Sequence, residues 1–180
     1  MRSKISAWIL KLLGWRITGT YPNSEPKNVL AVVPHTSWVD FPLGLLVRSA
    51  RKMDTRFLGK ASLFKGPMGG IFKWLGGYPV DRRGNQKMVD AVADIFDAHD
   101  KFDIAIAPEG TRKKVDKLRS GFYYIAKKSG AAIVLVTFDF GNKVVHFSDP
   151  IYPTDDESSD LKKIEDYFRG VQGKKIEYSF

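Results

Sequence analysis

Short apolar runs, each followed by a polar cluster, alternate along this chain with segments of helical periodicity. The three strongest apolar runs span residues 29–33, 102–107 and 133–138. Each has the length and composition of a buried β-strand. Helical spacing of apolar residues is found over 41–51, 85–99 and 118–128. Strands that alternate with helices predict an α/β fold: a single domain with a mixed, largely parallel sheet flanked by helices, plus an N-terminal amphipathic helix.

Weaker patterns complete this outline. Shorter strands are expected over 56–59 and 144–147, with another just before Asp81, and a closing helix should run from the acidic residues near 155–157 to about 170. The segment 60–75 is a broken helical stretch, rich in glycine and in large apolar residues. It could form one wall of an apolar groove, and packing in the core is the alternative.

The composition limits the class of protein. A length of 180 residues and an apolar share of 43% suit one globular domain. The chain has no cysteine, which excludes disulfides and thiolate metal sites, and its three histidines lack ligand spacing, so no metal site is expected. The net charge of +9 predicts an anionic partner. No nucleic-acid-binding motif is found, so a phospholipid surface or a phosphorylated substrate is the stronger prediction.

The first 17 residues have an amphipathic helical pattern. Its apolar face is formed by Ile5, Trp8, Ile9, Leu12 and Leu13, and its other face carries Lys4 and Lys11. The segment is shorter than the roughly 20 apolar residues that cross a bilayer. Tryptophans opposite lysines are typical of a helix in a membrane interface, and packing on the core is the alternative. We therefore expect 1–20 to form a membrane-interface helix and 21–180 to form the remaining domain.

A histidine and an aspartate follow the strand predicted over 29–33. His35 comes directly after its end, and Asp40 lies five residues further on. If Ser37 capped a helix that begins at the next residue, Asp40 would lie in the first turn and orient the imidazole. A histidine held by a carboxylate is a usual general base for a hydroxyl near neutral pH. The alternative is a capping box, in which Asp40 only satisfies backbone donors.

Two further polar clusters follow predicted strands. Asp81 and Arg82 come after a short strand, and the run 102–107 leads into Glu109, Gly110, Thr111 and Arg112. Ligands of α/β proteins bind beyond the carboxyl ends of strands, so these clusters and His35 are expected to share one cleft. Arginine is a planar donor suited to phosphate, and glycine lets a ligand approach the backbone closely. Lys113, Lys114, Lys117 and Arg119 extend the positive zone.

Together these segments resemble the signature of the glycerophospholipid acyltransferase family, which includes the lysophosphatidic acid acyltransferases. His35 to Asp40 is similar to its His-x4-Asp motif, Gly77 to Arg82 to its second block, and Ala107 to Arg112 to its third. Their order and spacing agree over about residues 30–140. The fourth block of the family usually has a proline within its apolar strand, where this chain has a leucine in 133–136.

The resemblance implies that 21–180 is an acyltransferase domain that acts in phospholipid biosynthesis without a metal or cofactor. His35, oriented by Asp40, would deprotonate the hydroxyl of a lysophosphatidic acid-like acceptor, which attacks an acyl thioester directly. The absence of cysteine and of a Gly-x-Ser-x-Gly elbow agrees with direct transfer. By the same resemblance the acceptor phosphate is bound by Arg82, Glu109, Gly110, Thr111 and Arg112, with Glu109 orienting an arginine.

The sequence is compatible with more than one acyl donor, acceptor and class of function. The acyl donor is acyl-CoA or acyl carrier protein, since both are anionic and suit a basic protein. The acceptor could instead be another lysolipid or an acylated amino acid. A hypothesis of another class is a basic protein that adsorbs to membranes without catalysis. The expected partner is in every case an anionic phospholipid surface, with the protein peripheral on the inner, cytoplasmic face of the cell membrane.

Overall fold

The computed structural model describes residues 2–80 and 85–180. In the described ranges the strands are β1 Arg16–Thr18, β2 Lys27–Val33, β3 Thr55–Lys60, β4 Gly77–Val80, β5 Phe102–Ile106, β6 Ala132–Asp139 and β7 Val144–Phe147. The helices are α1 Arg2–Leu12, α2 Asp40–Ala50, α3 Gly69–Trp74, α4 Asn85–Asp97, α5 Gly121–Ser129 and α6 Glu157–Phe168, with short 3-10 turns η1 Ala61–Phe64 and η2 Ile176–Tyr178.

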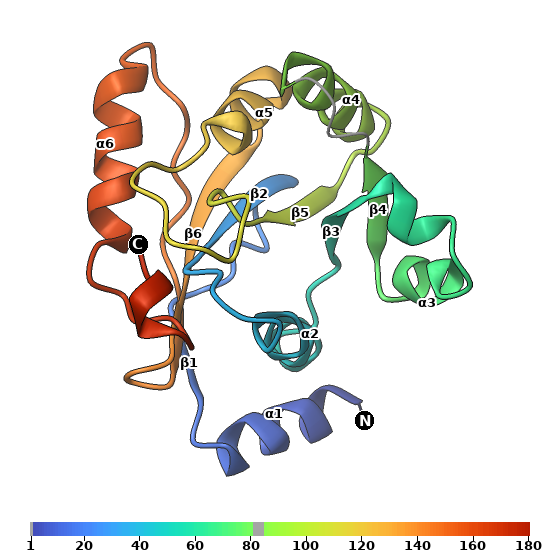
Figure 1. Ribbon diagram of the computed structural model, residues 1–180. Coiled ribbons are helices and arrows are strands. Elements are labelled where there is room, and N and C mark those ends of the chain that lie inside the picture. The colour runs from blue at the N-terminus through green and yellow to red at the C-terminus, as the bar shows by residue number, and fades with distance from the viewer. Residues whose placement is uncertain (1, 81–84) are drawn as a thin grey trace.

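The strands form one sheet in the spatial order β1-β7-β6-β2-β5-β3-β4. Neighbouring strands are parallel except for β6 and β7, which are antiparallel. Helices α4 and α5 lie on one face of the sheet, and α2 with α1 lies on the other (Figure 1). The predicted α/β fold with a mixed, largely parallel sheet is thereby confirmed.

The central strand β2 contributes to a core on each face. Val29, Ala31 and Val33 belong to the apolar cluster that includes residues of α4 and α5, whereas Leu30 belongs to the cluster that includes residues of α1 and α2. Side chains alternate between the faces of a strand, so a strand covered on both sides reads as a continuous apolar run. This is why the run 29–33 predicted a strand so clearly.

The N-terminal helix is shorter than predicted. It ends at Leu12 because the chain turns at Gly14, which has φ +80°, and the Trp15 N–H bonds back to the Leu10 carbonyl at 2.8 Å. Glycine adopts this left-handed conformation without a steric penalty. The residues that follow form β1, an unpredicted edge strand that is parallel to β7.

One side of α1 packs on α2, and the other is open. Leu10 is buried, and the Ser6 hydroxyl donates to Ser49 Oγ on α2 at 2.8 Å. Trp8 and Leu12 are 63% and 70% exposed. The helix therefore packs on the domain and still presents large apolar side chains to its surroundings. Across the described ranges, every helix is too short or too polar to cross a membrane.

The segment predicted as a groove wall or core lies on the surface. It forms η1 and α3 beside β4, at the edge of the sheet (Figure 1). Its exposed apolar side chains are Leu63, Met68, Ile71 and Trp74. For these four residues the core alternative is wrong, because η1, α3 and the turn between them lie at the sheet edge, and nothing in the described ranges covers their outer side.

The helix predicted over 118–128 begins later, at Gly121. The Leu118 N–H is bonded to the Glu165 carboxylate of α6 at 3.0 Å, so this part of the chain belongs to the loop that follows β5. The predicted end is correct: Gly130 caps α5 with φ +64°. The closing helix α6 begins after Asp156, whose carboxylate accepts the Ser159 N–H at 3.0 Å.

Candidate active site

His35 and Asp40 lie on either side of the turn that joins β2 to α2. His35 Nδ1 and Asp40 Oδ2 are 3.1 Å apart. The histidine side chain is 26% exposed, whereas the carboxylate is 4% exposed. The turn therefore brings the two side chains together as the sequence predicted, with the carboxylate beneath an accessible imidazole.

The same carboxylate also serves the backbone. Asp40 Oδ2 accepts the Ser37 N–H at 2.9 Å, and Ser37 Oγ accepts the Val39 N–H at 3.3 Å. The helix begins at Asp40 itself, whereas a cap at Ser37 would have started it at residue 38, and no side-chain bond caps it at Val39. Asp40 Oδ2 therefore both accepts the Ser37 N–H and contacts His35 Nδ1. The backbone bond fixes the position of this oxygen relative to the imidazole ring.

The contact with Asp40 assigns the two ring nitrogens of His35. A carboxylate can only accept hydrogen bonds, so the proton on a neutral imidazole resides on Nδ1, the nitrogen that faces Asp40. The other nitrogen, Nε2, then carries the lone pair. This tautomer leaves a proton acceptor on the side of the ring away from the carboxylate, as a general base requires.

Glu109 reaches the same turn from the neighbouring strand. Its Oε2 accepts the backbone N–H of His35 at 2.7 Å. Strands β2 and β5 are parallel, with Ala31 paired to Ile106, so residues a few positions beyond each strand meet. The sequence prediction that Glu109 orients an arginine did not include this contact with the backbone of the histidine.

The Glu109 carboxyl is 1% exposed. Burial raises its pKa to about 7, the His35 N–H acts in the opposite direction, and the charge of Asp40 raises it further. Loss of hydration penalises the charged form of a carboxyl group, and this is the larger effect here. The carboxyl consequently changes charge near neutral pH, directly beneath the backbone of His35.

Gly110 forms a tight turn after Glu109, with φ +65°. The guanidinium of Arg119 lies so close that a Cβ on Gly110 would be 2.8 Å from it. The Arg119 N–H also bonds to the Pro108 carbonyl at 2.9 Å. From the sequence, Arg119 was assigned only to a general positive zone. The structure places its side chain against Gly110, in the segment Ala107 to Arg112 that resembles the third block of the family and is called the third motif below.

The remaining residues predicted for the site are Thr111, Arg112 and Arg82. Thr111 Oγ1 accepts the Lys113 N–H at 3.3 Å, a contact within its own turn. Arg112 is exposed, and no partner for its guanidinium is found in the described ranges. Arg82 lies outside the described residues. In the same ranges, no three His, Cys, Asp or Glu side chains are grouped as metal ligands.

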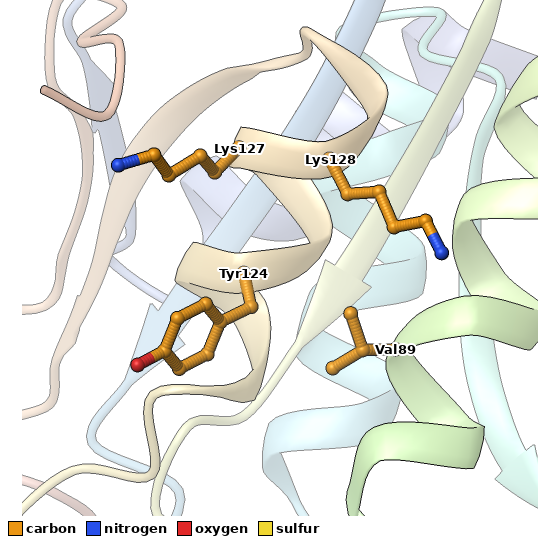
Figure 2. Close-up of a pocket in the computed structure, with 4 residues that line it drawn as sticks. All are labelled: Val89, Tyr124, Lys127 and Lys128. Atoms are coloured by element: carbon orange, nitrogen blue, oxygen red, sulfur yellow. The ribbon is translucent and has the colours of Figure 1, made fainter. Parts of the chain in front are cut away.

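A shallow pocket lies elsewhere, between α4 and α5. It is lined by Val89, Tyr124, Lys127 and Lys128, and the two lysine side chains point in different directions (Figure 2). Lys128 is paired with Asp90 at 2.6 Å, and Lys127 lies 3.5 Å from Asp155 and donates to the Thr154 carbonyl. Cations already held by acidic partners are poorly suited to bind a separate anion, so the candidate site remains the His35 turn.

Comparison with known proteins shows the fold and the family of the chain. No curated protein sequence matches the chain. Its fold is similar to the crystal structure of the 1-acyl-sn-glycerophosphate (LPA) acyltransferase PlsC from Thermotoga maritima, with a TM-score of 0.62 at 18% identity, over 94% of this chain and 76% of that one. A family model described as Acyltransferase matches residues 16–154, which include His35, Asp40 and the third motif. The chain therefore belongs to the acyltransferase family.

Proposed function

We propose that this protein transfers a fatty acyl group from an acyl thioester to the hydroxyl of a lysophosphatidic acid-like acceptor in phospholipid biosynthesis. His35 is the general base, and Asp40 orients it. The observation that carries the proposal is the pairing of His35 Nδ1 with the buried Asp40 carboxylate at 3.1 Å, in a member of the acyltransferase family.

The chemistry needs no covalent intermediate on the protein. His35 Nε2 takes the proton of the acceptor hydroxyl as its oxygen attacks the thioester carbonyl carbon. The C–S bond then breaks, an ester forms, and the imidazolium returns the proton to the leaving thiolate. Asp40 stabilises the transient positive charge on the ring and keeps its orientation. The acyl-CoA or acyl carrier protein is in this proposal a co-substrate and not a cofactor.

The acceptor phosphate is assigned to the cationic side of the site. Arg82 and Arg112 are the proposed donors to phosphate, and Gly110 and Thr111 shape the backbone around it. Glu109, being buried against His35, would position this loop and not touch the phosphate, since like charges repel. The exposed Arg119 against Gly110 is a further donor available to this proposed phosphate site.

An anionic membrane surface is the proposed location of the reaction, on the cytoplasmic face of the cell membrane. The exposed residues of α1 support this, since Trp8 and Leu12 are open to solvent, as are Lys4 and Lys11. Apolar side chains together with lysines are favoured at a bilayer surface that carries negative charge. A second surface supports it as well, because α3 exposes Trp74 and other apolar residues.

The proposal is tested by measuring thiol release from acyl-CoA and from acyl carrier protein across a panel of acceptors. The panel contains lysophosphatidic acid, other lysophospholipids and acylated amino acids, with anionic vesicles present. Release that depends on lysophosphatidic acid, and that falls by on the order of a hundredfold or more in His35→Ala, is the expected result. His99→Ala is the matched control, because His99 is an exposed residue beyond the end of α4 whose Nδ1 lies 2.7 Å from the Ile95 carbonyl.

The same panel separates the alternatives. Turnover with a different lysolipid or with an acylated amino acid would identify that compound as the acceptor in the same acyl-transfer reaction. Vesicle binding without turnover for any acceptor would instead identify a membrane-adsorbing protein without catalysis. Full activity of His35→Ala would remove this residue as the base.

A further inference from the structure

Thr36, the residue after the proposed base, is held by the C-terminal segment of the chain. Its side chain is 1% exposed, and its hydroxyl oxygen accepts the Lys175 N–H at 3.1 Å. The backbone of Gly173 lies so close that a Cβ there would be 2.6 Å from the Thr36 side chain. The turn that carries His35 is thereby packed against a segment more than 130 residues away in sequence.

The C-terminal segment is itself fixed at several points. The Gly173 N–H bonds to Ser179 Oγ at 2.9 Å, and the Phe140 N–H bonds to the Gln172 carbonyl at 2.7 Å. Phe180 packs on the apolar core beside α6. A segment with both ends anchored in this way can hold the group that it contacts in a defined position.

Helix α6, which precedes this segment, holds the loop that carries the third motif. Glu165 of α6 accepts the Leu118 N–H, and Leu118 lies on the loop between Glu109 and α5. The loop and the His35 turn are in turn joined by the bond from the His35 N–H to Glu109. The two motif loops are therefore each held by an element beyond residue 154, where the match to the family model ends: the histidine turn by residues 171–180 and the other loop by α6.

We infer that the C-terminal segment 171–180 is a positioning element of the active site, which acts through Thr36 to hold His35 in its catalytic orientation. The inference rests on the proposed role of His35 as general base. Thr36 has no role in the chemistry itself. Its hydroxyl oxygen connects the histidine turn to the Lys175 N–H and lies against the backbone of Gly173.

The test uses the full chain and four single variants. Thr36→Val keeps the shape of the side chain and removes the accepting oxygen, whereas Thr36→Ser keeps the oxygen. Gly173→Ala leaves Thr36 intact and adds a methyl group where no space exists. Gly66→Ala is the matched control, because a Cβ on Gly66 meets nothing within 4 Å. For each variant we would measure kcat, KM, circular dichroism and the imidazole NMR signals of His35.

A positioning role predicts that Thr36→Val and Gly173→Ala lower kcat by about tenfold to a hundredfold, with KM nearly unchanged. The His35 ring signals should shift in both, while Thr36→Ser and Gly66→Ala resemble the wild type. Unchanged kcat and unchanged ring signals in Gly173→Ala would overturn the inference, even if Thr36→Val failed to fold. If no acyl transfer is found, the His35 ring signals still test whether the C-terminal segment positions His35. Failure of the proposed function can therefore be told apart from failure of this inference.

Discussion

The carboxylate of Glu109 accepts the backbone N–H of His35 at 2.7 Å. The bond joins the end of β2 to the loop after β5, and so ties the first motif of the site to the third. A buried carboxyl group is costly unless it is hydrogen-bonded, which explains why Glu109 is directed at a backbone donor. Glu109, which contacts neither the His35 ring nor solvent, therefore helps to set the position of His35.

Glu109 should make the stability of the protein depend on pH. Its pKa is raised in the folded state from the ordinary value of 4.5 to about 7, so the folded protein keeps this proton over a range where the unfolded chain has lost it. The free energy of unfolding should consequently fall as pH rises from about 4.5 to 7, by roughly 3 kcal/mol at most. Urea unfolding at several pH values measures this dependence.

The variant Glu109→Gln isolates that contribution, because its amide oxygen can still accept the His35 N–H and has no titratable proton. Its free energy of unfolding should fall less than that of the wild type over the same pH range. Asp103→Asn is a comparison, since burial raises the pKa of Asp103 to about 6 and its effect has the same sign. A pH dependence in Glu109→Gln equal to that of the wild type would exclude Glu109 as its source.

Asp40→Asn should impair turnover while leaving the fold intact. An amide nitrogen in the place of Oδ2 would donate to Nδ1 and put the ring proton on Nε2, whereas an amide oxygen there would keep the Ser37 bond but lose the charge that stabilises the imidazolium. We expect kcat to fall on the order of a hundredfold or more, as for other oriented histidine bases. Asp54→Asn is the control, because Asp54 is an exposed residue paired with Arg56. A kcat within twofold of the wild type would contradict the assigned role of the Asp40 carboxylate.

Gly110→Ala should destabilise the protein through its backbone. The left-handed conformation at φ +65° costs an alanine about 1–2 kcal/mol. The nearby Arg119 side chain is the flexible end of a long residue, so it should move at little cost. The destabilisation should therefore be the same in an Arg119→Ala background. If that background removed most of the effect, the close approach of Arg119 would be its cause.

Glutamate substitutions on α1 test the proposed membrane surface. Trp8→Glu with Leu12→Glu places charge on the exposed side of the helix and leaves the buried Leu10 in place. Sedimentation with phosphatidylglycerol vesicles should weaken about tenfold or more, because buried apolar area is lost and charge repulsion is added. Trp74→Glu on α3 tests the second apolar surface in the same assay.

Ser158→Glu is the control for these charge changes, since Ser158 is exposed on α6. It should bind vesicles as the wild type does. Sedimentation of the double α1 variant equal to that of Ser158→Glu would mean that α1 serves only to pack on α2. The thermal stability of each variant shows whether the fold has been retained.

Much of the fold follows from local patterns in the sequence. The runs 29–33 and 133–138 are apolar on both sides of the strand, because helices cover both faces of the sheet, and they predicted β2 and β6 within a residue or two. Edge elements were less predictable. The three-residue β1 is too short to show a period, and it becomes a strand only because β7 lies beside it.

The sequence by itself predicted the pairing of His35 with Asp40, because a spacing of five residues across one tight turn lets the two side chains meet. Only the tertiary structure decided how Glu109 and Thr36 are used. Each contacts a group that is distant in the chain, the His35 N–H for one and the Lys175 N–H for the other. Such contacts depend on strand register and on the path of the C-terminal segment, which no local pattern of residues records.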